Sequence, residues 1–330
     1  MSYAIEISET GHPDVLTKGD RFVPTPAAGE ILIRNHSGAV NFIDTIIRRG
    51  EMPEGMMPSL PHVPGVEGAG VIEALGDGVE GFTVGDRVAW MGPIGAGGYG
   101  THSVIGATYV TRIGDISFEL AASIPVNAMT AYHMLVNLGG AAAGKSVLVH
   151  AAAGGVGTMI QHIAKYLGMT VIASVSTNKI AYAQDQGADH VIDYRNEDVT
   201  ARVLEITNGR GVDLTLNPIS GETLKSDLAA LAPLGTVVIF GFLAGPPAGT
   251  FGEDLAKHFQ NSVAVRVSDI YTYFANQPEA FGADLATVFD LLSKGVLRPQ
   301  ITTLPVIEAP EAHRRLEAGE TTGKLVLSIA

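Results

Sequence analysis

The sequence predicts an α/β protein with two domains, a barrel-like β domain followed by a doubly wound parallel sheet. The chain has 330 residues, more than one ordinary hydrophobic core holds, so two domains are expected. The pattern of apolar residues also changes near residue 126. Short strands broken by Gly and Pro precede that point, whereas apolar strands that alternate with helices follow it.

The first 125 residues carry the signals of short, paired strands. "EILIRNHSGAV" (30–40) alternates in part between apolar and polar residues, as expected of a strand with one buried face. "GDGVEGFTVGD" (76–86) is dense in turn-forming residues. We therefore predict an all-β domain of barrel type in this part of the chain.

The rest of the chain carries the signals of a parallel sheet. Its apolar runs lack alternation, which is typical of strands covered on both faces. Helices of about 10–15 residues separate these runs, as in repeated βαβ units. The predicted strands are "SVLVHA" (146–151), "TVIASV" (170–175), "HVIDY" (190–194), "VDLTLNP" (212–218) and "TVVIFG" (236–241), with helices from about 155, at 178–186 and around 221–232, and the last thirty residues read strand, helix, strand.

Composition and charge exclude several classes of protein. The formal charge of −13 argues against a nucleic-acid partner, because such surfaces carry a basic excess. The chain has no cysteine, which rules out disulfides and cysteine-ligated metal sites. It also lacks a long apolar run and the pattern of a signal peptide. We therefore expect a cytoplasmic protein without a membrane or nucleic-acid partner.

Two phosphate-binding patterns lie end to end in "GGAAAGKSVLVHAAAGGVG" (139–157). Residues 139–146 satisfy the nucleotide-triphosphatase pattern, but Lys145 and Ser146 run into a predicted strand instead of opening a helix. Residues 152–157 satisfy the dinucleotide pattern with Ala in its first position, and they lie between a strand and a helix. The context favours a dinucleotide site and makes an ATPase or GTPase the weaker alternative.

The end of the second parallel strand indicates which dinucleotide is bound. NAD sites usually carry Asp or Glu there, to bond the ribose 2′-hydroxyl. Here the stretch is "ASVSTNK" (173–179), with hydroxyls and Lys179 but no carboxylate. These groups suit a 2′-phosphate, so NADPH is favoured. The alternative for Lys179 is a solvated lysine at the start of a helix.

Several stretches together are similar to a known family. They occur in the same order over nearly the whole chain, and they resemble the quinone oxidoreductases (zeta-crystallin type) of the medium-chain dehydrogenase/reductase superfamily. The resemblance implies a GroES-like catalytic domain (1–125), a Rossmann NADPH-binding domain (126–296) and a C-terminal segment (297–330) that returns to the first domain. The stretches are "NFIDTIIRRG", "VPGVEGAGVIEALGDGV", "GDRVAW", "AASIPVNAMTAYHML", "VLVHAAAGGVG", "GADHVIDYRNEDV" and "GKLVLSI".

The resemblance also implies a site without zinc. Zinc-dependent members of the superfamily carry a cysteine near "NFIDT" and a Gly-His-Glu further on. Here the corresponding residues are Asn41 and Val66 before Glu67. We expect neither a catalytic nor a structural metal ion.

By the resemblance, Asn41, Asp44 and Thr130 lie beside the nicotinamide, and Asn41 donates to the carbonyl oxygen of the substrate. The alternatives are that Asn41 caps a turn and that Asp44 caps the helix after it. The tyrosine often found in this motif is replaced by Ile46. The implied cofactor residues are Gly154, Gly155, Val156 and Gly157 at the pyrophosphate, Ser176, Lys179 and Tyr194 near the 2′-phosphate, Asn217, Phe240, Gly241 and Arg266 beside the adenosine or nicotinamide, and Lys324, which approaches the phosphate from the C-terminal segment.

The resulting hypothesis is an NADPH-dependent, zinc-independent reductase of quinones or α,β-unsaturated carbonyls. Without a Lewis acid, a conjugated acceptor suits the site because its enolate needs only hydrogen bonds and a proton. The resemblance implies a homodimer. The alternatives are an enoyl-thioester or halo-acrylate reductase on the same scaffold, and a non-enzymatic NADPH-binding stress protein.

Overall fold

The computed structural model describes residues 2–329, which form two compact units. The first unit comprises Met1–Met129, Tyr273–Gly295 and Pro299–Ala330, and the second comprises Thr130–Thr272 and Val296–Arg298. Among the described residues, no helix is both long and apolar enough to cross a membrane.

The first unit is built around a seven-stranded sheet. Six of its strands are paired in the order β14-β15-β3-β4-β5-β7, and the seventh strand, β6, pairs with β3. A separate antiparallel pair, β1 and β2, completes the β structure. The predicted all-β domain also contains helices, so that expectation was wrong in detail. The elements are β1 (Ser2–Ile7), β2 (Leu16–Arg21), β3 (Glu30–Ala39), α1 (Phe42–Arg49), β4 (Glu67–Leu75), β5 (Arg87–Met91), β6 (His102–Gly106), β7 (Val110–Arg112) and α2 (Phe118–Ala122), and from the end of the chain α10 (Pro278–Ser293), β14 (Ile301–Pro305), α11 (Ala309–Glu317) and β15 (Lys324–Ser328).

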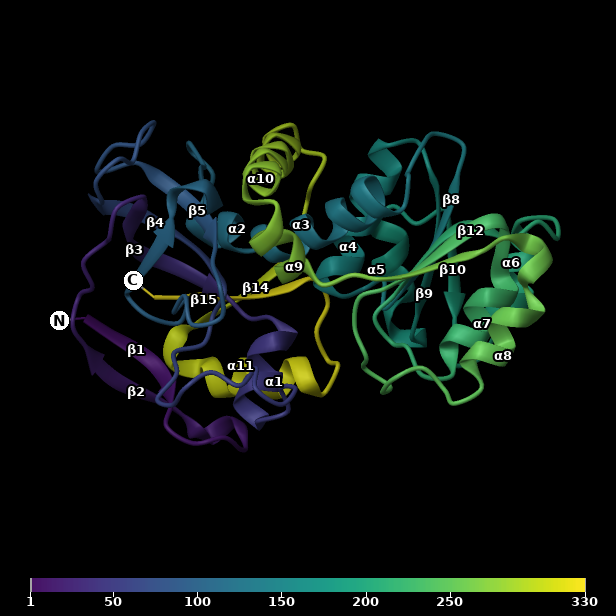
Figure 1. Ribbon diagram of the computed structural model, residues 1–330, viewed down its shortest axis with the longest axis horizontal. Helices are drawn as coiled ribbons and strands as arrows, with labels where there is room; N and C mark the ends of the chain where they lie inside the picture. Colours follow the sequence, from purple (N-terminus) through teal and green to yellow (C-terminus); the bar gives the residue numbers. More distant parts are fainter. Residues whose placement is uncertain (1, 330) are drawn as a thin grey trace. The chain divides into compact units, whose positions relative to one another are not determined.

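The C-terminal segment lies in the first unit, where β15 pairs antiparallel with β3 and carries β14 on its other side (Figure 1). Residues 126–129 and 273–295 also belong to this unit, which corrects the expected assignment of residues 126–296 to the second domain. Packing explains the difference for α10. The ring of Phe281 on α10 is fully buried and meets Tyr109 edge-on, with centroids 5.7 Å apart. That contact attaches the helix to the β sheet of the first unit.

Helix α1 begins directly after β3, at a capping box. The backbone N–H of Asn41, the N-cap residue, donates to the carboxylate of Asp44 at 2.9 Å. The helix ends at Gly50, which takes the left-handed conformation with φ of 76°. Because the helix begins at Phe42, Asp44 is its third residue and not its cap, so the sequence-based alternative placed the helix start three residues too late.

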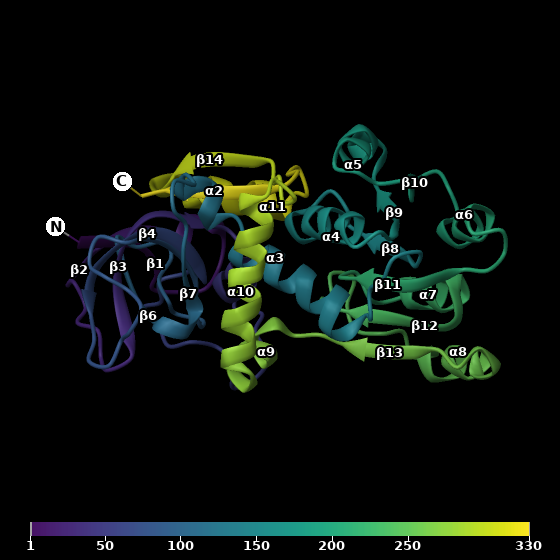
Figure 2. The ribbon, with the colours of Figure 1, turned by 90° about the horizontal axis from the view of Figure 1, so that it is seen from above.

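The second unit is a six-stranded parallel sheet in the order β10-β9-β8-β11-β12-β13. Figure 2 shows α4 along one side of this sheet and α7 and α8 along the other. β9 and β10 follow β8 on one side, and β11, β12 and β13 follow on its other side. This reversal of strand order is the doubly wound arrangement. The elements are α3 (Pro125–Tyr132), whose first residues belong to the first unit, then β8 (Ser146–His150), α4 (Gly155–Tyr166), β9 (Thr170–Val175), α5 (Ile180–Asp185), β10 (His190–Asp193), α6 (Val199–Ile206), β11 (Val212–Asn217), α7 (Thr223–Ala230), β12 (Leu231–Ile239), α8 (Phe251–Lys257), β13 (Ala264–Val267) and α9 (Ile270–Asn276).

The triphosphatase-like pattern lies at the start of β8, as the sequence predicted. The Ser146 amide and hydroxyl both donate to Asp213, at 2.9 and 3.1 Å. The Lys145 ammonium donates to the Gly140 carbonyl oxygen at 2.7 Å. These groups are used inside the fold, and a strand follows them where a phosphate-binding loop requires a helix. The nucleotide-triphosphatase alternative is therefore wrong.

Candidate functional site

The turn between β8 and α4 has the geometry of a pyrophosphate site. Gly154 is the N-cap of α4, and Gly154, Gly155 and Val156 are partly exposed at the start of this 12-residue helix. The first backbone N–H groups of a helix lack partners within it, so they can bind an anion. A Cβ on Gly157 would lie 2.6 Å from the Ala151 carbonyl oxygen, which leaves no room for any other residue.

The strained residue of this turn is Ala151, not Ala152, where the sequence pattern placed the tightest position. Ala151 has φ of 49°, a left-handed conformation that residues with a Cβ seldom adopt. The Ala152 amide donates to the Ser174 carbonyl oxygen at 3.3 Å, which links the turn to the end of β9. The turn is therefore held against the neighbouring strand.

The other predicted cofactor residues follow the carboxyl ends of the parallel strands. Ser176 follows β9, Tyr194 follows β10, and Phe240 and Gly241 follow β12. Parallel strands bring these ends to one edge of the sheet, and ligands of doubly wound sheets bind at that edge where the strand order reverses. Arg266 lies near the end of β13 and is exposed. The fold thus gathers these residues along one edge of one sheet.

The region predicted to hold a 2′-phosphate contains a carboxylate that the sequence reasoning missed. Asp193 ends β10 and accepts a hydrogen bond from the Thr177 hydroxyl at 2.6 Å. It also accepts from the Asn196 amide at 2.7 Å and the Arg195 backbone N–H at 3.1 Å. Led by the Thr177 bond, these contacts lower the pKa of Asp193. Its oxygens are occupied by these donors.

Ser176 precedes and Lys179 ends the short turn after β9 (Thr177–Lys179), and Thr177 of this turn bonds to Asp193. The Ser176 hydroxyl donates to the Asn178 side chain at 2.7 Å. Burial lowers the pKa of Lys179. Tyr194 is 51% exposed, so its ring is open to solvent or a ligand. The hydroxyl and ammonium groups expected from the sequence are therefore present together after β9.

Asn217 lies at the end of β11, but its side chain is not available for a cofactor. Its Oδ1 accepts from the backbone N–H groups of Ile219 and Ser220, at 2.6 and 2.9 Å. Its Nδ2 donates to Thr223 and to Asp227. All four bonding positions of the amide are used to shape the turn into α7. Asn217 could therefore lie beside a cofactor only with its backbone, since its side-chain amide is engaged within the turn.

In the first unit, Asn41 is part of a buried polar cluster. Its Oδ1 accepts from the Lys324 ammonium at 2.5 Å, and its Nδ2 donates to Glu67 at 2.8 Å. The other carboxylate oxygen of Glu67 accepts from the Val126 backbone N–H at 2.7 Å. The amide of Asn41 is thus fixed between a cation and an anion, and one Nδ2 hydrogen is left over.

Lys324 was predicted to approach the cofactor phosphate, and the structure corrects this. Its ammonium forms a buried ion pair with Glu67 at 2.7 Å, with side-chain exposures of 5% and 0%. An ammonium fixed in this way has no direction left for a phosphate. Glu67 and the partnership with Lys324 were missed by the sequence reasoning. The signal for them was an isolated acid inside the apolar, Gly-rich stretch "VPGVEGAGV".

Asp44 lies beside this cluster but bonds to other groups. Its carboxylate accepts from the backbone N–H groups of Asn41 and Gly65, at 2.9 and 3.0 Å. The Tyr99 hydroxyl lies 3.4 Å from it and 3.0 Å from Nε2 of His313. Complete burial raises the pKa of Asp44 to about 6, and burial lowers the pKa of His313 to about 3. Asp44 therefore fixes the backbone N–H groups of Asn41 and Gly65.

Thr130 lies in α3 and is partly buried. Among residues 2–329, no group of three or more His, Asp or Glu side chains could hold a metal ion. In place of the histidine and cysteine ligands of zinc-dependent relatives, the polar residues around Asn41 are an acid, an ammonium and amides. This donor set does not fit a zinc ion.

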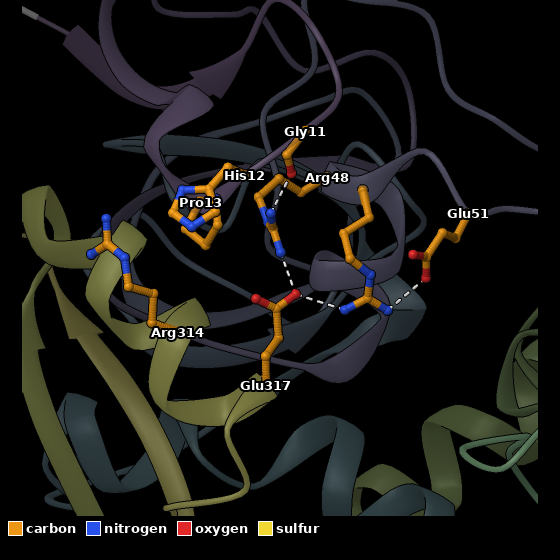
Figure 3. Close-up of a pocket in the computed structure, with 8 residues that line it drawn as sticks. Gly11, His12, Pro13, Arg48, Glu51, Arg314 and Glu317 are labelled. Carbon is orange, nitrogen blue, oxygen red and sulfur yellow. Dashed lines mark hydrogen bonds and ion pairs between the residues drawn. The ribbon is translucent and has the colours of Figure 1, made fainter.

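A separate pocket of about 580 Å³ lies in the first unit (Figure 3). The Glu317 carboxylate pairs with the guanidinium groups of Arg48 and Arg49, and Figure 3 shows Glu317 directed toward Arg48. Glu51 also pairs with Arg49, and Arg314 pairs with Asp14 outside the lining. The arginines are thus matched by carboxylates, and none of the predicted site residues lines this pocket.

Two families of known protein domains match the chain. Residues 27–115 match the alcohol dehydrogenase GroES-like domain family, and residues 186–327 match the zinc-binding dehydrogenase family. The chain is 36% identical over 331 residues to the quinone oxidoreductase of Pseudomonas aeruginosa, with 99% of each chain covered. It is 33% identical over 335 residues to the 2-haloacrylate reductase of a Burkholderia species, again with 99% of each covered.

Among solved structures, the Escherichia coli quinone oxidoreductase complexed with NADPH is 31% identical, with a TM-score of 0.88 over 99% of this chain and 100% of that one. The two domain families and the parallel-sheet fold define an oxidoreductase of the medium-chain dehydrogenase/reductase superfamily. Within this superfamily the full-length identity shows that the chain belongs to the quinone oxidoreductase family.

Proposed function

We propose that this protein binds NADPH and reduces quinones or α,β-unsaturated carbonyls by hydride transfer, without zinc. The observation that carries the proposal is the amide of Asn41, which Lys324 and Glu67 hold in one orientation at 2.5 and 2.8 Å. This amide retains one N–H donor. A fixed donor of this kind stabilises negative charge that develops on a carbonyl oxygen.

For the cofactor, the proposal uses the turn before α4 and the groups after β9. The exposed N-terminus of α4 would receive the pyrophosphate, and Ser176 and Lys179 would hold the 2′-phosphate. Gly157 supports this role because it has no Cβ, so the first turn of α4 can lie against the backbone of Ala151 and Ala152. Phe240, Gly241, Tyr194 and Arg266 would line the same edge, and the NADPH complex of the Escherichia coli relative supports the choice of cofactor.

NADPH, when bound, supplies the hydride that the acceptor receives. The residues of this chain then have two tasks. Asn41 donates its remaining N–H to the acceptor oxygen, where the electron pair accumulates as an enolate or hydroquinone anion. Asp44 holds the backbone N–H groups of Asn41 and Gly65 in place, so that the donor keeps its position. In this proposal Thr130 lies beside the nicotinamide.

A second candidate acceptor is a 2-haloacrylate. The 33% identity to a 2-haloacrylate reductase over the whole chain favours it over other conjugated acids. The reaction is the same addition of hydride to an electron-poor carbon, and only the acceptor differs. An enoyl thioester is a further conjugated acceptor of the same chemistry.

The experiment that tests this proposal is NADPH oxidation followed by absorbance, with a benzoquinone, a short enone, 2-chloroacrylate and an enoyl thioester offered in turn. We expect turnover with the quinone or the enone and a higher kcat/KM than with the other two. Highest kcat/KM with 2-chloroacrylate would establish the second candidate. Absence of turnover with all four acceptors would contradict both.

We also propose a homodimer that forms through the edge of the parallel sheet. Strand β13 lies at this edge, with Val267 67% exposed, and Phe259 just before the strand is 85% exposed. Exposed edge strands with apolar side chains pair readily with another chain. Sedimentation velocity should give the mass of a dimer, and a Val267→Lys variant should shift it to a monomer. A monomeric unaltered protein would contradict the proposal.

A further inference from the structure

Among the buried side-chain atoms of the first unit that lack a hydrogen-bond partner, the amide of Asn127 is the one beside the Asn41 cluster. The side chain of Asn127, near the start of α3, is 4% exposed, and its Nδ2 bonds to no atom of residues 2–329. Burying an amide donor without an acceptor costs about 1–3 kcal/mol. An unpartnered buried donor calls for an explanation, and a catalytic role is one of those known for such groups.

The orientation of this amide follows from its neighbour. The Lys324 ammonium lies 3.4 Å from Oδ1 of Asn127. An ammonium has three donors and no acceptor, so the atom that faces it must be the amide oxygen. The NH2 group of Asn127 is therefore directed away from Lys324, and rotation of the amide would place two donors against each other.

Lys324 orients a second amide in the same way. Its remaining hydrogen bonds go to Oδ1 of Asn41 at 2.5 Å and to Glu67 at 2.7 Å, so its three donors meet three acceptors. Asn41 and Asn127 thus both present their oxygens to one cation. Glu67 accepts only one hydrogen of the Asn41 amide, so one N–H of Asn41 is left without an acceptor among the described residues. The NH2 group of Asn127 has no acceptor among them either.

We propose that Nδ2 of Asn127 donates a hydrogen bond to the carbonyl oxygen of the acceptor substrate, as a second donor beside Asn41. This inference rests on the proposed function. In this proposal the two amide donors, which one buried ammonium orients, act together on the oxygen where negative charge develops. The bond to the cation also polarises each amide, which strengthens its N–H as a donor. Asn127 then belongs to the machinery that stabilises the enolate.

Two substitutions separate this role from a structural one. Asn127→Asp keeps an oxygen for Lys324 but replaces the donor with a second acceptor, whereas Asn127→Leu removes both groups at similar volume. If Asn127 donates to the substrate, both variants lose that hydrogen bond and therefore activity. If Asn127 only accepts from Lys324, the Asp variant keeps this function and only the Leu variant loses it.

The measurements are kcat and KM for a quinone or enone acceptor, the Kd of NADPH from a fluorescence titration without acceptor, and the thermal midpoint. We expect kcat to fall by about tenfold or more in both variants, because the bond is strongest in the charged transition state. The Kd of NADPH should stay within about twofold, and the fall in kcat should exceed the rise in KM.

Three results would overturn the inference. Near-normal kcat in Asn127→Asp would make Asn127 an acceptor for Lys324 only. Near-normal kcat in both variants would mean that the donor does not act on the substrate. A loss of NADPH affinity equal to the loss of kcat/KM would assign the donor to the cofactor. Turnover by the unaltered enzyme is measured first, so failure of the proposed function would be recognised separately.

Discussion

The ammonium of Lys324 lies 2.7 Å from the carboxylate of Glu67, and both side chains are buried. Removing one partner of a buried pair leaves an unpaired charge in the protein interior, which typically costs about 3–5 kcal/mol. We therefore expect Lys324→Met to lower the free energy of unfolding by about this amount. Chemical denaturation measures the change directly.

The matched controls for this prediction are a double variant and an exposed pair. Glu67→Gln together with Lys324→Met removes both charges and should recover a large part of the loss. Lys165→Met breaks the ion pair between Lys165 and Asp189, whose side chains are 41% and 33% exposed. This variant should lower the free energy of unfolding by at most about 1 kcal/mol. Equal losses for Lys324→Met and Lys165→Met would contradict a role for burial.

The glycines at the start of α4 give a second prediction. A Cβ at position 157 would lie 2.6 Å from the backbone of Ala151 and Ala152, whereas a Cβ at position 154 would lie 3.3 Å from the Ala151 oxygen. We expect Gly157→Ala to destabilise the protein by roughly 1–3 kcal/mol and to weaken NADPH binding. Gly154→Ala should be milder in both respects. Thermal unfolding measures the stability of both variants, and a titration measures their affinity for NADPH. A larger loss in Gly154→Ala than in Gly157→Ala would contradict the close packing of Gly157.

The choice between NADPH and NADH gives a third prediction. Lys179 ends the turn after β9, where the proposal places the 2′-phosphate. Replacing it with Ala should raise KM for NADPH by about tenfold and leave KM for NADH within about twofold, because only NADPH carries the additional charge. Steady-state kinetics with both cofactors test this. Equal changes in the two KM values would show that Lys179 does not contact the 2′-phosphate.

Stability should also depend on pH through a buried histidine of the second unit. His162 accepts from the Arg298 backbone N–H at Nδ1, and its Nε2 lies 3.2 Å from the Gln186 amide oxygen, so the neutral ring is bonded on both sides. Burial lowers the pKa of His162 to about 4, with a smaller contribution from the Arg298 charge. The neutral form therefore stabilises the fold above the ordinary histidine pKa of 6.5, and this contribution is lost as the pH falls toward 4.

Between about pH 7 and pH 5, this histidine alone should account for roughly 2 kcal/mol of lost stability. His162→Gln removes the titrating ring, so the variant should lose correspondingly less over the same interval. Urea unfolding of both proteins at the two pH values measures the difference. The same pH dependence in both would mean that His162 is not buried in its neutral form.

The proposal of a reaction without zinc is tested by metal removal. The residues around Asn41 do not supply a tetrahedral set of histidine and thiolate ligands. Prolonged treatment with a zinc chelator should therefore leave kcat and the thermal midpoint unchanged. Loss of either, with recovery on addition of Zn²⁺, would contradict the proposed mechanism.

The sequence predicted the second unit more closely than the first. Its strands are continuous apolar runs, and β9 begins and ends at the predicted residues 170 and 175. The pattern there is strong because both faces of the strands are buried. The glycine motif lies between β8 and α4, as predicted, because a position between a strand and a helix is a local property of the chain.

The polar cluster of the first unit could not be predicted from local patterns. Lys324 reaches Asn41 across 283 positions of sequence, because β15 pairs with β3. The family resemblance implied that Lys324 approaches a phosphate from the C-terminal segment. Only the tertiary fold shows that Glu67 neutralises it. The same holds for Asn217, which resembles a free amide at a strand end but is consumed by the turn that follows.

The central claim is that hydride passes from NADPH to a conjugated carbonyl acceptor. The most direct measurement uses NADPH that carries deuterium at the reactive carbon of the nicotinamide, prepared separately as each of its two stereoisomers, with an enone as the acceptor. We predict that one stereoisomer yields a saturated product with deuterium on the carbon β to the carbonyl, as mass spectrometry would detect, and that the other yields unlabelled product. A reduced product without deuterium from either stereoisomer, or no reduced product at all, would contradict the account.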